Sequence, residues 1–173
     1  AERGIRAERY PPAAVMLLAA RGRLELVRGR YDASIAAFHA AERAGEMLAS
    51  PHAVGSRARG HLLIALLRAG DVAAVQRALA DLHEPDDRDA AEVRIVTAAL
   101  ALDERRPADA VAALAPIVDP SAPEVVGQRW MIQALLLDAT ARDALGDADA
   151  AGRALEHALE LAEADGILLP FLL

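Results

Sequence analysis

A short turn segment recurs four times along the chain, and this recurrence constrains the fold more than any other feature. The four copies begin at residues 29, 70, 105 and 146 and are therefore spaced by 41, 35 and 41 residues; they read GRYDA, GDVAA, RRPAD and GDADA. Each copy follows one apolar stretch and precedes another. Self-similarity at such a period is typical of helical repeats, so each segment is predicted to be the turn of a helix hairpin.

The residues of these turns suit the end of one helix and the start of the next. Glycine is favoured where a helix ends in a left-handed residue, and it opens three of the copies, at Gly29, Gly70 and Gly146. A carboxylate can accept hydrogen bonds from the free N–H groups of a helix start, and aspartates stand where the next helices should begin, at Asp32, Asp71 and Asp147.

The third copy departs from this pattern without losing it. Arg105 replaces glycine, and Pro107 falls in the first turn of the following helix, where its missing N–H costs little. The other prolines of the middle and later chain are predicted to lie between hairpins, where they end or open helices: Pro51, Pro85, Pro116, Pro120 and Pro123.

The similarity extends into the flanking helices. Five residues after the first turn residue stand Ser34, Val75, Ala110 and Ala151, and nine after it stand Phe38, Leu79, Leu114 and Leu155. Residues four apart share a helix face, so each pair is predicted to face the core. Seven residues before the turn stand Gly22, Leu63, Ala98 and Ala139. Small residues there allow two helices to cross closely, whereas Leu63 predicts a shifted or looser second hairpin.

The predicted fold is all-α. Aromatic residues make up only 3% of the chain, while strong helix formers dominate. We expect one repeat domain over residues 1–173, with hairpins at 12–49, 51–83, 87–118 and 123–165 and an apolar tail at 166–173. The individual helices are expected at 12–28, 31–49, 51–69, 71–83, 87–103, 107–118, 123–145 and 147–165.

This pattern resembles the tetratricopeptide repeat, with the best matches at 29–41 and 146–159. The resemblance implies a right-handed superhelix of about four helix hairpins, an α-solenoid. The irregular spacing and the ending at 154–166, followed by Leu169, Pro170 and Phe171, are similar to the sensor region of MalT-like, LuxR-type bacterial transcriptional regulators.

In that family an ATPase module precedes the repeats and a DNA-binding helix-turn-helix follows them. The resemblance therefore implies a sensing region that takes a small-molecule inducer or a protein or peptide partner, cut from a larger regulator. The chain contains no lysine, so it cannot supply the P-loop lysine, and the helix-turn-helix would lie beyond Leu173. The alternative is a stand-alone tetratricopeptide adaptor that holds a peptide or helix in its concave groove.

Charge and composition exclude several classes of protein. The net charge is −7 with interspersed arginines, which argues against nucleic-acid contact by this chain. There is no cysteine, so thiolate chemistry is excluded and a reducing, cytoplasmic location is expected. The longest apolar runs, 13–20 and 62–67, are far shorter than the roughly 20 residues of a membrane-spanning helix. The apolar tail is expected to pack on a neighbouring segment, to fold back or to mediate dimerisation. The prediction made from it is self-association at the C-terminal end, and hence a homo-oligomer.

No catalytic or metal-binding motif is present. The five histidines form no HExxH pair, and no serine lies in a GxSxG elbow. The adjacent acids at 86–87 and 103–104 are interpreted as solvated helix ends. The chain is therefore predicted to be non-catalytic, with neither metal nor cofactor.

A polar stripe on the first helix of each hairpin is the candidate binding site. Arg57, His61 and Arg68 lie within about 40° of one another around a helix. The same spacing, or a comparable face, is found at Arg129, Gln133, Thr140, Arg23 and Glu92. In stacked repeats these helices line the concave groove, so the stripe could present donors to a carboxylate, a phosphate or sugar hydroxyls. The alternative is a solvated groove wall balanced by nearby acids. Trp130 is interpreted as a packing residue rather than a platform for a sugar ring.

Overall fold

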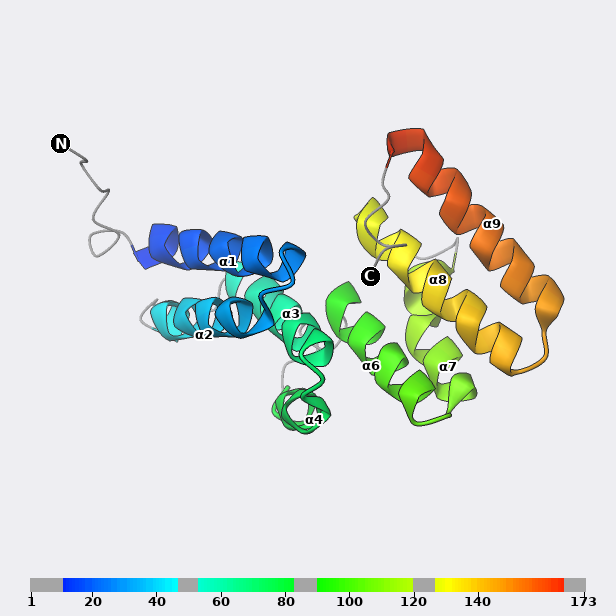
Figure 1. Cartoon of the computed structure of the whole chain (residues 1–173), viewed down its shortest axis with the longest axis horizontal. Helices are drawn as coiled ribbons and strands as arrows, with labels where there is room; N and C mark the ends of the chain where they lie inside the picture. Colours follow the sequence, from blue (N-terminus) through cyan, green and yellow to red (C-terminus); the bar gives the residue numbers. More distant parts are fainter. Residues whose placement is uncertain (1–10, 47–52, 83–89, 120–126, 167–173) are drawn as a thin grey trace. The chain divides into compact units, whose positions relative to one another are not determined.

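The structure, a computed structural model, describes residues 11–46, 53–82, 90–119 and 127–166, and these contain eight helices and no strand (Figure 1). The prediction of an all-α chain is confirmed. The helices are α1 (Pro11–Val27), α2 (Tyr31–Glu46), α3 (Ala53–Arg68), α4 (Val72–Ala80), α6 (Ala91–Asp103), α7 (Pro107–Val118), α8 (Gln128–Ala144) and α9 (Ala148–Asp165). They belong to two compact units, Ala1–Glu92 and Val93–Leu173, which are described separately. The expectation of a single repeat domain stays a prediction.

All four predicted turns are present and share one hydrogen-bond pattern. Each contains a left-handed residue, with φ of 70° at Gly29, 78° at Gly70, 59° at Arg105 and 82° at Gly146. The N–H of that residue donates to the carbonyl three residues earlier, at 2.9–3.0 Å, and the next N–H donates to the carbonyl five residues earlier, at 2.7–3.1 Å. This is the Schellman arrangement, which satisfies carbonyls left open at a helix end.

The starts of the following helices are also satisfied locally. Asp71 and Asp147 cap α4 and α9, accepting hydrogen bonds from the N–H groups of Ala74 and Ala150 at 2.9 and 3.0 Å. Asp32 lies in the first turn of α2, where a negative charge is favoured by the helix dipole. The aspartates of the turns therefore act at helix starts, as the sequence predicted.

The third turn is stabilised by a different set of contacts. Arg105 has a left-handed backbone conformation although it is not a glycine. For such a residue this conformation costs about 1–2 kcal/mol. Beside it, Arg106 hydrogen-bonds Glu104 and donates from Nη1 to Asp109 at 2.6 Å. The hydrogen bond and charge of Glu104, and then those of Asp109, raise the pKa of Arg106 above its ordinary value. Ion pairs on both sides of the turn thus replace the side-chain cap found at Asp71 and Asp147.

Proline positions are predicted only in part. Pro107 opens α7, as expected, and α7 has the predicted bounds. Pro116 was expected between hairpins, and this is wrong: it lies inside the last turn of α7. The loss of its N–H there removes a single helical hydrogen bond, and the helix ends two residues later. The other four prolines of that prediction lie outside the described residues.

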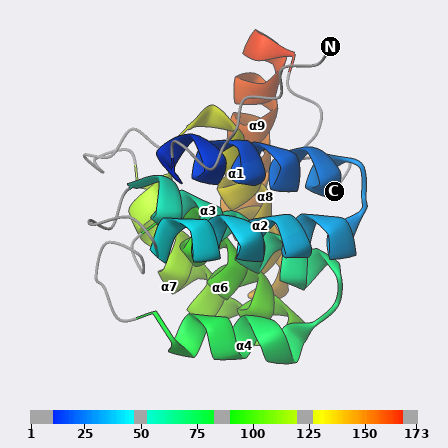
Figure 2. The same cartoon turned by 90° about the vertical axis from the view of Figure 1, so that its left-hand side faces the viewer.

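In the first unit, α2 packs against both α1 and α3, and α3 also packs against α1 and α4 (Figures 1 and 2). Gly22 makes the close crossing of α1 and α2 possible, because a Cβ there would lie 2.7 Å from the Phe38 ring. Phe38 is fully buried, and its ring centroid lies 5.9 Å from that of His61 on α3. Leu63 is also fully buried, and α4 makes a much smaller contact with α3 than α2 makes with α1, as the looser second hairpin predicts.

In the second unit, α8 packs against α7 and α9. The core between α8 and α9 joins Ile132 and Leu135 to an alanine stripe on α9, made of Ala154, Ala158 and Ala162. The expectation that Leu155 faces the core is wrong, because its side chain is 43% exposed. The core face of α9 is one position away from the predicted one and begins at Ala150. Leu161 packs at the edge of this face, whereas Leu155 and Leu159 are exposed.

Candidate functional site

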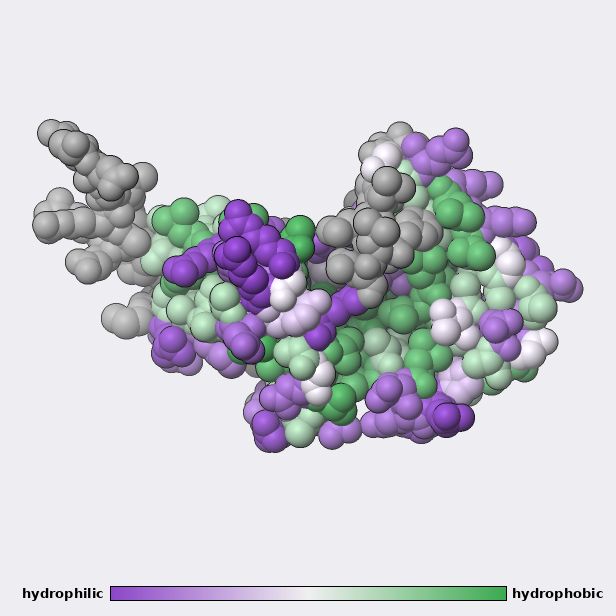
Figure 3. Space-filling model, viewed as in Figure 1, coloured by the Kyte–Doolittle hydropathy of each residue, from purple (hydrophilic) through white to green (hydrophobic). Residues whose placement is uncertain are grey.

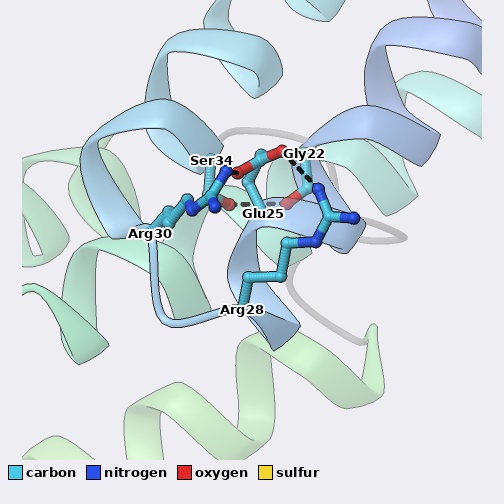
Figure 4. A network of polar contacts seen from close by, with 5 residues as sticks. All are labelled: Gly22, Glu25, Arg28, Arg30 and Ser34. Atoms are coloured by element: carbon cyan, nitrogen blue, oxygen red, sulfur yellow. Dashed lines mark hydrogen bonds and ion pairs between the residues drawn. The ribbon is translucent and has the colours of Figure 1, made fainter.

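The best-defined polar cluster of the first unit lies at the end of α1 and the start of α2 (Figure 4). Glu25, whose side chain is 11% exposed, accepts from Arg28 at 3.3 Å and from Arg30 at 3.4 Å. The buried hydroxyl of Ser34 donates to the Gly22 carbonyl at 2.8 Å. The cluster ties the two helices together across the turn. Its carboxylate is enclosed, while the guanidinium groups of both arginines remain partly exposed.

The candidate residues of α1 and α3 do not form one exposed stripe. Arg23 is exposed and Arg68 is half-buried. His61 is only 6% exposed and packs against Phe38, so its ring belongs to the core of the first unit rather than to a groove surface. Arg57 lies in α3, but its side chain is outside the described ones.

Glu92 differs from the other candidates because it is a buried carboxylate, 8% exposed. It is the last residue of the first unit, and it lies so close to Gly60 that a Cβ there would be 2.7 Å from the Glu92 Cβ. Gly60 therefore provides the room for Glu92. This close approach was not predicted from the sequence, although an isolated glycine within a helical pattern is a recognised sign of close packing.

In the second unit, the candidates lie along α8. The guanidinium carbon of Arg129 lies 4.1 Å from the centre of the Trp130 ring, which is cation–π geometry. Gln133 is half-buried one turn further along. Near them, Gln128 donates from Nε2 to the Leu161 carbonyl at 2.7 Å and holds the start of α8 against α9. The start of α8 therefore brings together a cation, an indole ring and an amide.

Thr140 lies nearer the other end of α8 and is exposed, but its hydroxyl donates to the carbonyl of Leu136 at 2.9 Å. Such a bond to the preceding turn occupies the hydroxyl proton within its own helix. Arg129 and Gln133 are one turn apart on α8, whereas Thr140 is more than one turn from either of them. Arg129 and Gln133 are thus the candidates that lie together.

One buried charge could be located only from the structure. Asp138 is 3% exposed and accepts from Nε of Arg142 at 2.6 Å, one turn further along α8. Its second oxygen, Oδ1, has no hydrogen-bond partner among the described residues. A carboxylate that interrupts the apolar run at 134–137 and precedes an arginine by four residues was the available signal.

The described residues contain no group of three or more histidine, aspartate or glutamate side chains able to hold a metal ion. Within the same residues, no helix is long and apolar enough to cross a membrane. Comparisons of the chain with models of known protein families, with curated proteins and with solved structures returned no match.

Proposed function

We propose that the chain is a non-catalytic interaction module that binds a partner through the surfaces of its helices. The observation that carries this proposal is the same two-hydrogen-bond turn at four positions, at Gly29, Gly70, Arg105 and Gly146. The turn is constant, while the outward side chains differ from one helix pair to the next. Repeat proteins that bind partners typically keep the same turn in each repeat and vary the side chains on the repeat surface, whereas enzymes need a defined catalytic site.

In its more specific form, the module is the sensing region of a MalT-like, LuxR-type transcriptional regulator in the bacterial cytoplasm. This form rests on the resemblance of the sequence. A ligand would act there by favouring one arrangement of the helix pairs over another. It is tested in the parent reading frame, where a helix-turn-helix after Leu173 and a lysine-containing P-loop upstream would support it. Stop codons at both places would refute the regulator form and favour the adaptor.

The start of α8 is the surface best suited to a ligand in the second unit. The Arg129 guanidinium presents planar donors for a carboxylate, a phosphate or sugar hydroxyls, and it lies over the Trp130 ring in cation–π geometry. Gln133 adds an amide that can donate and accept. These groups define the ligand classes to be screened: sugars, phosphorylated or carboxylated metabolites, and peptides with acidic side chains.

The experiment is a screen of those ligand classes by thermal shift, followed by titration of tryptophan fluorescence. Trp130 is the only tryptophan of the chain, so its emission reports directly on this surface. We expect a ligand that raises the unfolding temperature and changes Trp130 emission, and we expect Arg129→Ala to weaken its binding about tenfold or more. Arg153→Ala, on an exposed position of α9, is the matched control and should leave binding unchanged.

Two outcomes would count against this surface. A ligand whose thermal shift is the same in wild type and Arg129→Ala binds elsewhere. If no ligand of any of the three classes changes either signal, the start of α8 is not a binding surface.

A further inference from the structure

The first helix carries an exposed apolar face in addition to its buried one. Met16, Leu17, Leu24 and Val27 are each 48–59% exposed. At 100° per residue they lie within about 100° of one another around α1, so they form a single stripe. The opposite side of α1 carries Val15 and Gly22, which are buried. We call the exposed stripe the α1 face.

The equivalent positions of α3 and α8 are buried, and a preceding helix packs against each of these two helices. Leu24 and Leu17 stand five and twelve residues before the left-handed residue of their turn. The same positions are occupied in α3 by Ala65 and Ala58 and in α8 by Ala141 and Ala134, and all four alanines are at most 2% exposed. The preceding helix packs against each of these helices, α2 against α3 and α7 against α8. The α1 face is therefore the surface that receives a preceding helix.

The last helix carries the complementary surface. Leu155 and Leu159 stand nine and thirteen residues after their turn residue and are 43% and 50% exposed. In α2 these positions hold Phe38, which packs on His61 of α3, and Glu42, which pairs with Arg59 of α3 at 3.7 Å. On α2 both positions thus face the following helix.

The same holds in the second unit. In α7 the two positions are occupied by Leu114, which is fully buried, and Val118, which packs against the core of α8 and α9. Leu155 and Leu159, which we call the α9 face, therefore form the surface that covers a following helix.

The charges beside the two faces have opposite signs. Residues 11–30 hold four arginines and one glutamate: Arg21, Arg23, Arg28, Arg30 and Glu25. The helix α9 holds five acids and one arginine: Asp149, Glu156, Glu160, Glu163, Asp165 and Arg153. Hydrophobic atoms reach the surface over both α1 and α9, beside hydrophilic ones (Figure 3). Apolar faces within borders of opposite charge fit each other better than either face fits itself.

We propose that the α9 face of one copy packs against the α1 face of a second copy, so that the chain associates with itself head to tail. The contact repeats between two molecules the packing of α2 on α3 and of α7 on α8 within one molecule. Because the two faces differ, the contact is heterologous, and such a contact produces either a closed ring or an open chain of copies. The association is independent of the ligand expected at the start of α8.

The first test uses sedimentation velocity of the full chain over a range of concentrations. We expect the unmodified chain to associate, and we expect Leu17→Glu with Leu24→Glu, or Leu155→Glu with Leu159→Glu, to weaken association more than tenfold. Leu145→Glu is the matched control, since Leu145 is 51% exposed but lies on neither face, and it should associate like wild type. Circular dichroism checks folding, and all substituted positions are exposed. An unmodified chain that stays monomeric at every concentration overturns the proposal.

The second test mixes the two double variants. Each retains one intact face, so a head-to-tail contact predicts that each alone is monomeric and that an equimolar mixture forms heterodimers and nothing larger. If the α9 variant alone still dimerises, or if the mixture stays monomeric, the proposal is wrong.

Cysteine cross-linking gives an independent readout, because the natural chain has no cysteine. Leu24→Cys and Leu155→Cys, mixed and oxidised, should yield the mixed disulfide well above either homodimer. A purely statistical mixture of the three disulfides would overturn the proposal.

Discussion

Gly22 shows how one missing side chain sets the distance between two helices. Its Cα faces the Phe38 ring so closely that a methyl group would lie 2.7–2.9 Å from three ring carbons. Its carbonyl accepts from the buried hydroxyl of Ser34 at 2.8 Å. A glycine, a serine and a phenylalanine at these spacings were identified in the sequence, but their mutual contact follows only from the way α1 and α2 pack.

Gly22→Ala is therefore predicted to lower the free energy of unfolding by about 1–3 kcal/mol through overpacking. Phe38→Leu removes ring atoms that the new methyl group would meet, so the double variant should be less destabilised than the sum of the single ones, by more than 0.5 kcal/mol. Gly45→Ala, where a Cβ meets nothing within 4 Å, is the control and should not destabilise. Urea unfolding followed by circular dichroism measures all four. If the losses of stability of the two single variants simply add up in the double variant, the new methyl group at position 22 does not clash with the Phe38 ring.

Two glycines of the fourth helix pair should respond in opposite directions to the same substitution. Gly146 is left-handed, with φ of 82°, so Gly146→Ala should lower the free energy of unfolding by about 1 kcal/mol. Gly152 lies inside α9 with open space around its Cβ position, so Gly152→Ala should raise it by about 0.5–1 kcal/mol. Thermal and urea unfolding of both variants would measure this. Equal signs would contradict the assignment of the turn.

At the scale of the helix, the positions of the turns could be predicted, while the faces of the helices could be predicted only in part. Glycine and aspartate act through their own backbone and nearest neighbours, so local sequence sufficed for the turns. Which face of α9 meets α8 depends on the partner helix. The alanine stripe of α9 packs against α8, while Leu155 is exposed. His61 was assigned to a groove from its spacing alone, although its burial against Phe38 depends on a different helix.

The ion pair within α8 leads to a prediction at this scale. Asp138 is almost completely buried, and Arg142 supplies the hydrogen bond to its Oδ2. Arg142→Ala should lower the free energy of unfolding by about 2 kcal/mol, because it leaves an uncompensated buried carboxylate. Asp138→Leu added to Arg142→Ala should restore part of the loss. Chemical unfolding with Arg153→Ala as an exposed control measures this, and an equal, small effect of both arginine variants would show that the pair is not stabilising.

At the scale of the whole molecule, the described residues form two helical units. In each unit the second helix of one pair packs on the first helix of the next pair, α2 on α3 and α7 on α8. The surface of α1 that corresponds to the receiving faces of α3 and α8 is exposed, and so is the surface of α9 that corresponds to the covering faces of α2 and α7. Exposed leucines are found on both, at α1 and at α9. The apolar residues at 167–173, from which self-association was first expected, lie outside the described residues. The two faces provide a route to association that does not need them.

The central claim is that the packing of α2 on α3 and of α7 on α8 can be repeated between molecules, with α9 of one copy on α1 of another. Sedimentation of the unmodified 18.2 kDa chain at increasing concentration tests it most directly. We predict that the weight-average mass rises with concentration, because the α9 face of one copy binds the α1 face of another. A mass that stays at 18.2 kDa at every concentration would contradict this prediction.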